Sequence, residues 1–321
     1  MSSVDGLVRP VAQNGCGRGS TRKLRRLIHR GLVAPAVVLL AVALWAASSP
    51  SVFAAGTVNV LYAGSLVNMM EHGVGPAFEK ATGDTFQGYA GGSVGLANQI
   101  KGRLRQEGVF ISANPKVNDA LTGATNGHWV HWYIAFAQSP LVIGYSPSSK
   151  FVADFKDKPW YQVLLDPGIR IGRTDPKLDP KGALTLSLMR QAETFYNVPD
   201  LSQCALGAPD NPAQILPEET LIGRLQSGQP DAGFFYSTET ADAKIPAIEL
   251  PAAVTPTAVY TVSVLVNAPN PTGADHFVAF LLGPEGQKLM KQHGLELQKL
   301  NLVGAESAVP PDIQLLLDKT K

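Results

Sequence analysis

The sequence between residues 57 and 300 alternates short apolar runs with stretches of helical periodicity. The apolar runs that predict strands lie at residues 58–61, 85–89, 109–112, 141–145, 169–172, 232–236 and 259–266. The patterns that predict helices lie at residues 66–80, 95–105, 115–121, 183–196, 218–227 and 287–293. Strands that alternate with helices predict an α/β fold with mainly parallel sheets and right-handed crossovers. Pro- and Gly-rich stretches at 146–160 and 197–217 predict surface loops.

The first 54 residues follow a different pattern. Residues 22–30 are cationic, residues 32–47 are apolar, and Val52-Phe53-Ala54 ends in a small residue. This order is typical of a secretory signal peptide, with cleavage predicted after Ala54. An uncleaved membrane anchor is the alternative, although the apolar run is shorter than the roughly 20 residues of a spanning helix.

Charge and cysteine content limit the function classes. Residues 1–54 hold seven of the 27 Lys and Arg residues and one of the 26 Asp and Glu residues, so the remaining chain carries a net charge of −5. An acidic exported protein lacks the basic surface that nucleic acids require. Cys16 lies in the predicted signal, which leaves Cys204 without an intrachain disulfide partner.

Serine and glycine follow two of the predicted strands. Ser65 stands after the first strand, and Ser93 lies in the run Gly91-Gly92-Ser93-Val94-Gly95. Free amides at helix N-termini collect anions, and ligands of open α/β sheets bind beyond the carboxyl ends of strands. Together with a third turn at residues 179–182, these turns predict a site for a small oxyanion. Each serine alone could equally be a helix N-cap.

Several segments resemble the molybdate/tungstate-binding proteins of ABC transporters. The matching segments are VNVLYAGSL at 58–66, GGSVG at 91–95, VFISAN at 109–114 and AGFFYS at 232–237. The segments HWYIAFA at 131–137, VIGY at 142–145 and DPKLDPKG at 175–182 are closer to the tungstate-type branch.

This resemblance implies a two-lobed, type II periplasmic binding protein fold, with a mainly parallel sheet and flanking helices in each lobe. Residues 55–143 and 262–321 would form lobe 1, residues 144–261 would form lobe 2, and the ligand would lie between them. The implied function is capture of tungstate or molybdate in the periplasm and delivery to an ABC permease. It also implies a monomer without cofactor or enzymatic activity. Sulfate, thiosulfate or an organic anion is the alternative ligand.

The resemblance also implies which residues bind the ligand. Ser65 and Ser93 would donate hydrogen bonds from lobe 1. In lobe 2, the backbone amides of Lys181 and Thr220 and the phenol of Tyr236 would donate. Molybdate and tungstate are fully deprotonated near neutral pH, so a site made of donors suits them. Tyr236 could otherwise be an ordinary half-buried strand residue.

Asp179 does not fit an all-donor site. In the tungstate-type branch a carboxylate at this position contacts the metal directly, which makes Asp179 a possible ligand of molybdenum or tungsten. The second carboxylate of that branch is replaced here by Phe235. The alternative is that Asp179 caps the helix that follows it.

Two other patterns suggest different structures or chemistry. Residues 91–95 match the G-x-S-x-G pattern of serine hydrolases, but only His276 and His293 come late enough in the sequence to follow an acid as that triad requires. A secreted serine hydrolase is therefore a remote alternative. The spacing of Trp129, Trp132 and Tyr133 predicts the apolar face of a helix.

Overall fold

A computed structural model describes residues 56–319, so the predicted signal peptide lies outside the described residues. The chain begins there with β1 (Thr57–Ala63), which pairs in parallel with β2 (Thr85–Gly91) and β3 (Val109–Ser112). These three strands coincide closely with the predicted ones. The parallel arrangement expected from alternating strands and helices is confirmed in this part of the sheet.

The helical segments that follow these three strands differ in type or length from the predicted helices. They are η2 (Gly64–Leu66), α2 (Val67–Met69), the π-helical turn η3 (Met70–Val74), α3 (Gly75–Thr82), α4 (Ser93–Lys101), α5 (Pro115–Asp119) and η4 (Ala124–Asn126). The helix predicted over residues 66–80 thus changes type three times, from 3-10 to α, to π and back to α. Pro76, in the first turn of α3, has no amide to donate and favours a new helix start there.

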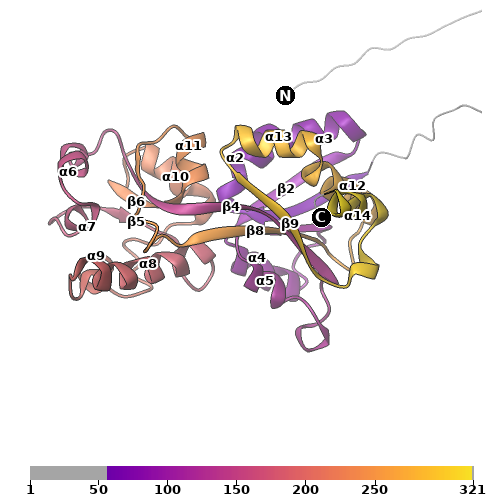
Figure 1. The fold of residues 1–321 in the computed structure, drawn as a ribbon, viewed down its shortest axis with the longest axis horizontal. Coiled ribbons are helices and arrows are strands. Elements are labelled where there is room, and N and C mark those ends of the chain that lie inside the picture. The colour runs from indigo at the N-terminus through magenta and orange to yellow at the C-terminus, as the bar shows by residue number, and fades with distance from the viewer. Residues whose placement is uncertain (1–55, 320–321) are drawn as a thin grey trace, which may run out of the picture. The chain divides into compact units, whose positions relative to one another are not determined.

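The sheet is mixed because its long central strands pair with their neighbours in the antiparallel direction. β4 (Trp132–Tyr145) pairs with β8 (Thr257–Val264) and with β9 (Glu296–Gly304). Among residues 56–319 the sheet has nine strands, and its main order is β2-β1-β3-β8-β4-β6-β5. The prediction of mainly parallel strands is therefore wrong for its centre (Figure 1).

The start of β4 also corrects the prediction of a helical aromatic face. Trp132 and Tyr133 are buried strand residues, whereas Trp129 lies before the strand. Residues 132–137 are apolar without alternation because both faces of β4 are covered there. Such a run cannot be assigned to strand or helix by periodicity.

The second half of the sheet is built on the C-terminal end of β4. Its residues 141–145 pair with β6 (Ala232–Tyr236) and β7 (Ala247–Ile248), and β6 pairs in parallel with β5 (Ile171–Gly172). The accompanying helices are α6 (Val152–Asp157), α7 (Trp160–Val163), α8 (Pro180–Tyr196), α9 (Leu201–Leu206), α10 (Glu218–Gln226) and α11 (Ser237–Asp242). α6 and α9 lie in stretches that were predicted as loops, and α7 begins at the last residue of the first of these stretches.

The C-terminal elements return to the first half of the sheet. They are α12 (Pro271–Leu282), α13 (Pro284–Gln292), η5 (Glu306–Ala308) and α14 (Pro311–Asp318). α12 contacts β1 and β8, and Phe277 meets the ring of Phe78 at 5.1 Å between centroids. In Figure 1 these yellow helices lie beside the indigo elements. The two lobe boundaries given above stay a prediction.

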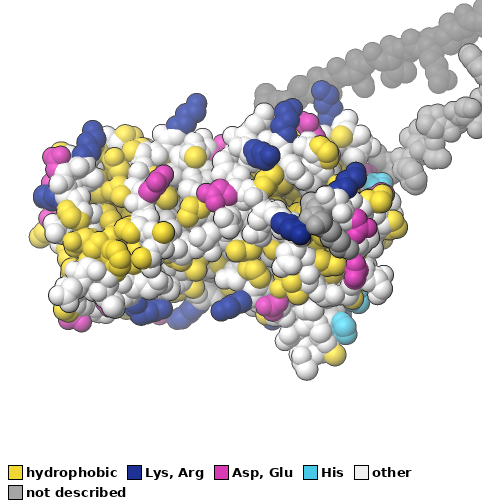
Figure 2. Space-filling model, in the orientation of Figure 1, with side chains coloured by type: hydrophobic (Ala, Val, Ile, Leu, Met, Phe, Trp, Pro, Cys, Tyr) yellow, Lys and Arg dark blue, Asp and Glu magenta, His cyan; other side chains and the backbone are white. Residues whose placement is uncertain are grey.

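One face of the molecule shows how charged and apolar side chains are distributed. On the face drawn in Figure 2, Lys and Arg side chains are dispersed, and apolar side chains gather at the end that carries α6 and α7. None of the helices within residues 56–319 is both long and apolar enough to span a bilayer.

Candidate binding cleft

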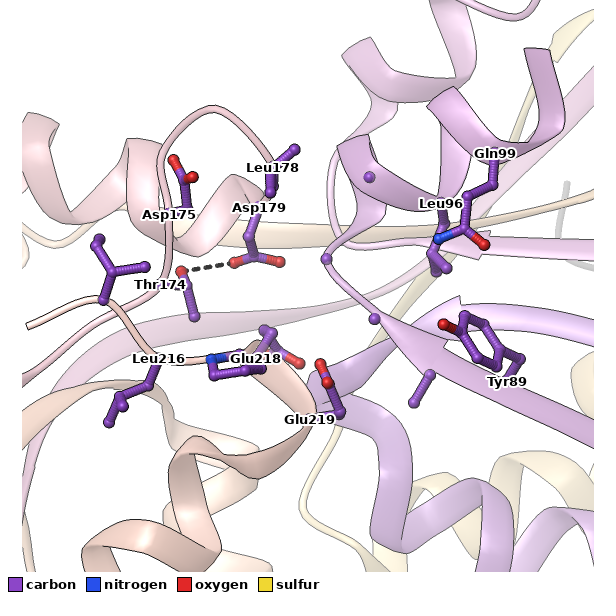
Figure 3. Close-up of a pocket in the computed structure, with 16 residues that line it drawn as sticks. Tyr89, Leu96, Gln99, Thr174, Asp175, Leu178, Asp179, Leu216, Glu218 and Glu219 are labelled. Atoms are coloured by element: carbon purple, nitrogen blue, oxygen red, sulfur yellow. Dashed lines mark hydrogen bonds between the residues drawn. The ribbon is translucent and has the colours of Figure 1, made fainter. Parts of the chain in front are cut away.

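A cleft of about 480 Å³ opens where the carboxyl end of β2 faces the loops before α8 and α10. Gly91 and Gly92 line one side, and Thr174, Asp179 and Glu218 line the other. Figure 3 shows Asp179 and Glu218 pointing toward the opening, opposite Tyr89 and Gln99. The 91–95 turn and the loop that ends at Asp179 therefore face each other across the cleft.

The two predicted serines lie on the first-half side of the cleft. Ser65 follows β1 in η2, and its Oγ lies 3.0 Å from the hydroxyl of Tyr260 on β8. Ser93 is the first residue of α4, is fully buried, and accepts the Ala113 amide at 3.1 Å. Neither residue is the N-cap of its helix, so the simple capping alternative is wrong for both.

Asp179 is the N-cap of α8. Its Oδ1 accepts hydrogen bonds from the Lys181 amide and from the Thr174 hydroxyl, both at 2.9 Å. The capping interpretation is confirmed, although α8 begins at Pro180, earlier than predicted. Because the Lys181 amide already donates to Asp179, that amide is engaged within the protein. Among residues 56–319 no group of three His, Cys, Asp or Glu side chains is arranged for a metal ion.

The side chain of Lys181 has a role that the sequence did not suggest. It is fully buried, and its Nζ donates at 2.8 Å to Glu218 Oε1 and to both carboxylate oxygens of Glu239. Glu239 Oε2 also accepts the Tyr236 amide at 2.7 Å. One ammonium thus holds two carboxylates from α10 and α11.

Tyr236 lies beside this ion cluster at the end of β6. Lys181 Nζ lies 5.3 Å from the centroid of its ring, and the ring of Tyr260 meets it edge-on at 6.1 Å between centroids. Tyr236 is 1% exposed, yet its hydroxyl has no hydrogen-bond partner. Glu218 Oε2 is buried without a partner as well. Buried polar groups are nearly always satisfied, so both atoms call for an explanation.

The two sides of the cleft approach each other closely through glycine. A Cβ at Gly92 would lie 2.6 Å from the Leu178 carbonyl oxygen, and the Gly95 amide donates to that oxygen at 2.9 Å. A Cβ at Gly64 would collide with Glu218 Oε2. Glycine at these positions therefore permits the backbone contact between the two sides.

Comparison with known proteins places the chain in a family. Residues 58–296 match the family model described as bacterial extracellular solute-binding protein. The chain belongs to this family. The match covers most of the chain and gives the class of protein, but the family description names no solute.

Relatives with descriptive names support the same class. A putative ABC transporter molybdenum-binding protein of Haloferax volcanii is 31% identical over 201 residues, which cover 62% of this chain and 61% of the relative. The molybdate/tungstate-binding protein WtpA of Thermococcus kodakarensis is 27% identical over 83% of this chain and 86% of the relative. This solute-binding protein spans 61% of the length of the first two relatives it matches.

The solved structures show the fold. The periplasmic molybdate-binding protein of Azotobacter vinelandii superposes with a TM-score of 0.59 at 22% identity, over 75% of this chain and 99% of that chain. The solute-binding protein therefore has the type II periplasmic binding protein fold that the resemblance implied.

In the cleft of this solute-binding protein, burial is the largest cause of the pKa shifts of the two carboxyl groups. Burial raises the pKa of Glu218 well above its ordinary value, and Glu239 and Asp179 add to the shift, while Lys181 opposes it. Burial likewise raises the pKa of Asp179, against Lys181 and Thr174. Burial alone would lower the pKa of Lys181, but the surrounding carboxylates hold it above its ordinary value.

The structure brings together five of the six predicted site residues. Asp179 lines the cleft itself. The Lys181 amide donates to Asp179, the Lys181 ammonium lies over the Tyr236 ring, and the Tyr260 ring links Tyr236 to Ser65. Ser93 directly follows Gly92, which lines the opposite side. Thr220 does not join them: it is exposed, its amide faces the Pro217 carbonyl at 3.2 Å, and it lines a different hollow of the surface.

Sequence reasoning missed Glu218, Glu239 and Tyr260. The two glutamates lie in the first turns of α10 and α11, where acidic side chains ordinarily favour the helix dipole. Tyr260 stands in an apolar strand. Because a helix start accounts for both glutamates and an apolar strand accounts for Tyr260, nothing in the local sequence assigned these residues to a binding site.

Proposed function

We propose that this protein captures molybdate or tungstate in the cleft and delivers it to an ABC permease. The observation that carries the proposal is the buried Tyr236 hydroxyl, which lacks a partner next to the Tyr260–Ser65 pair. A hydroxyl left free inside the protein is suited to donate to a ligand. The names of the Haloferax and Thermococcus relatives support the same ligand class.

The donor set fits the chemistry of these anions. A fully deprotonated oxyanion accepts hydrogen bonds only, and Ser65, Ser93 and Tyr236 offer hydroxyl groups from both sides of the cleft. We assign Asp179 to the cap of α8, where it orders the loop. Asp179→Asn would keep a capping oxygen and remove a negative charge from the cleft, so the affinity for a dianion should not decrease in that variant.

The decisive test is calorimetric titration of the purified protein with molybdate, tungstate, sulfate and phosphate at one ionic strength. Tight binding of the first two anions alone is the expected outcome. Ser65→Ala and Ser93→Ala should each weaken that binding by about 1–3 kcal/mol, the effect of losing a hydrogen bond to a charged group. Tight binding of sulfate instead would favour the alternative of another anion on the same scaffold.

Export and assembly complete the proposal. The cationic and apolar segments before residue 54 support a cleavable signal and a periplasmic location. The proposal includes a monomeric protein that meets its permease at the membrane. The hydrolase alternative is disfavoured because, within residues 56–319, Ser93 Oγ bonds to the Ala113 amide and not to a histidine, the base that a serine nucleophile requires. A serine-directed covalent label should accordingly leave the protein unmodified.

A further inference from the structure

Glu218 lines the cleft with one carboxylate oxygen satisfied and the other free. Oε1 accepts from Lys181 Nζ at 2.8 Å, whereas Oε2 is buried without a partner and faces Gly64, the residue before Ser65. The residue is 5% exposed. The free oxygen therefore points from the second-half side toward the serine turn of the first half.

The charges around Glu218 do not balance. The groups that face it from the neighbouring elements are Lys181 on α8, Asp179 before α8, Glu239 on α11, Tyr236 at the end of β6 and Tyr260 on β8. Lys181 is the only cation among them, and Glu239 already holds it through both oxygens. A second buried carboxylate beside one ammonium favours its neutral form.

We infer that Glu218 binds the oxyanion as a neutral carboxylic acid, whose Oε2–H donates to the ligand, so that the site holds one proton for each dianion. The inference rests on the proposed function and adds a binding residue to it. The proton comes from solvent and stays on Glu218 Oε2 while the ligand is bound. The raised pKa of Glu218 supports this protonation.

A neutral acid resolves a conflict within the proposed site. An ionised Glu218 would repel a dianion at close range in a region that excludes water. The protonated form removes that repulsion and turns the free oxygen into a donor, as Tyr236 and the serines already are. Loss of the proton at higher pH should therefore release the ligand.

The test is calorimetric titration of the purified protein with molybdate across neutral and alkaline pH, in buffers of different ionisation enthalpy. Above the pKa of Glu218 in the free protein, the wild-type association constant should fall about tenfold per pH unit, with uptake of about one proton per ligand. Glu218→Gln should bind across the whole range without that fall, because its amide donates in place of the acid. The neighbouring variant Glu219→Gln should keep the wild-type pH dependence.

Three outcomes would overturn the inference. One is molybdate binding whose affinity is the same at every pH. Another is a Glu218→Gln variant that melts cooperatively like the wild type but keeps the full pH dependence. The third is phosphate binding that exceeds molybdate binding and disappears in Glu218→Gln, since Glu218 would then be an acceptor for the proton of the ligand.

A second variant keeps the inference testable if Glu218→Gln does not fold. Glu239→Gln removes a negative charge that raises the pKa of Glu218 and leaves Lys181 to lower it. The fall in molybdate affinity should therefore begin at a lower pH than in the wild type. A fall that begins at the same pH would contradict the role of Glu218. Absence of binding of both molybdate and tungstate to the wild-type protein at any pH would instead refute the proposed function itself.

Discussion

Glu218 and Asp231 are two carboxylates of the same half of the molecule with opposite surroundings. Asp231, 3% exposed, accepts four hydrogen bonds, from Ser149 Oγ and from the amide, Nε and Nη2 of Arg170, at 2.8–3.0 Å. Glu218 is nearly as buried, but one of its oxygens accepts only from a shared ammonium and the other has no partner.

The two environments shift the pKa in opposite directions. Burial alone would raise the pKa of Asp231, but hydrogen bonds from Arg170 and Ser149 hold it below its ordinary value. Burial raises the pKa of Glu218, and one shared lysine does not reverse it. A carboxylate with every oxygen satisfied stabilises the fold, whereas one with a free oxygen in a cleft is available to a ligand.

The largest effect is expected from removing the ammonium that Glu218 shares. Lys181→Met should lower the free energy of unfolding by about 3–5 kcal/mol at neutral pH, because buried Glu239 loses its cation and Glu218 loses its hydrogen-bond donor. Chemical denaturation measures this loss. Lys177→Met is the control, since its ion pair with Asp210 is exposed and should change stability little. Equal effects of the two variants would show that the buried cluster is not stabilised by Lys181.

A smaller effect should follow from a substitution that separates the two sides of the Glu218 cleft where Gly92 lies against Leu178. Gly92→Ala places a methyl group 2.6 Å from the Leu178 carbonyl oxygen and should cost about 1–3 kcal/mol of stability or of molybdate binding. Gly95→Ala is the matched control, because its nearest neighbour would be that same oxygen at 3.8 Å. Denaturation and titration of both variants distinguish a steric contact from a general intolerance of alanine.

Substitution of Asp231 should reveal the opposite pH dependence of the two carboxylates. Asp231→Asn should lose about 1–2 kcal/mol of unfolding free energy at neutral pH, allowing for the exposure of Arg170. Because the pKa of Asp231 is lowered on folding, its contribution is present above the ordinary pKa of aspartate and disappears as the pH falls through the folded value. The variant and the wild type should therefore converge in acid.

For Glu218 the sign is reversed. Its pKa is raised on folding, so the wild type loses stability as the pH rises from the ordinary pKa of glutamate through the folded value. Glu218→Gln should consequently become more stable than the wild type on the alkaline side. If the unfolding free energies of the two proteins changed with pH in parallel, the pKa of Glu218 would not be raised on folding.

The smallest effect on stability is expected at Tyr236. Tyr236→Phe removes a buried hydroxyl without a partner, so stability should stay level or rise by at most about 1 kcal/mol while molybdate binding weakens. Tyr260→Phe instead loses the hydrogen bond to Ser65 and should reduce stability by about 0.5–1.5 kcal/mol. Thermal denaturation and titration of the pair measure both effects. A clear loss of stability in Tyr236→Phe would show that its hydroxyl is satisfied within the protein.

Local sequence patterns predicted a large part of the fold. The strands β1, β3 and β6 and the cap at Asp179 depend on residues within one turn or one strand. The turns with Ser65 and Ser93 were predicted for the same reason, since they directly follow strands. The parallel pairing of β1 with its neighbours was predicted from the alternation of strands and helices. The long strand β4 was not predicted over its full length, because its apolar first part lacks the alternation that marks a half-buried strand.

Contacts between distant residues could not be predicted from such patterns. Lys181 meets Glu218 across 37 positions and Glu239 across 58, and Ser65 meets Tyr260 across 195. In the sequence, both glutamates are ordinary first-turn acids and Lys181 is a residue near a helix start. The sequence thus settled the class of fold and the serine turns, because those depend on neighbouring residues. Only tertiary packing decided which buried oxygens remain unsatisfied, because a hydrogen bond between distant elements exists only once the chain has folded.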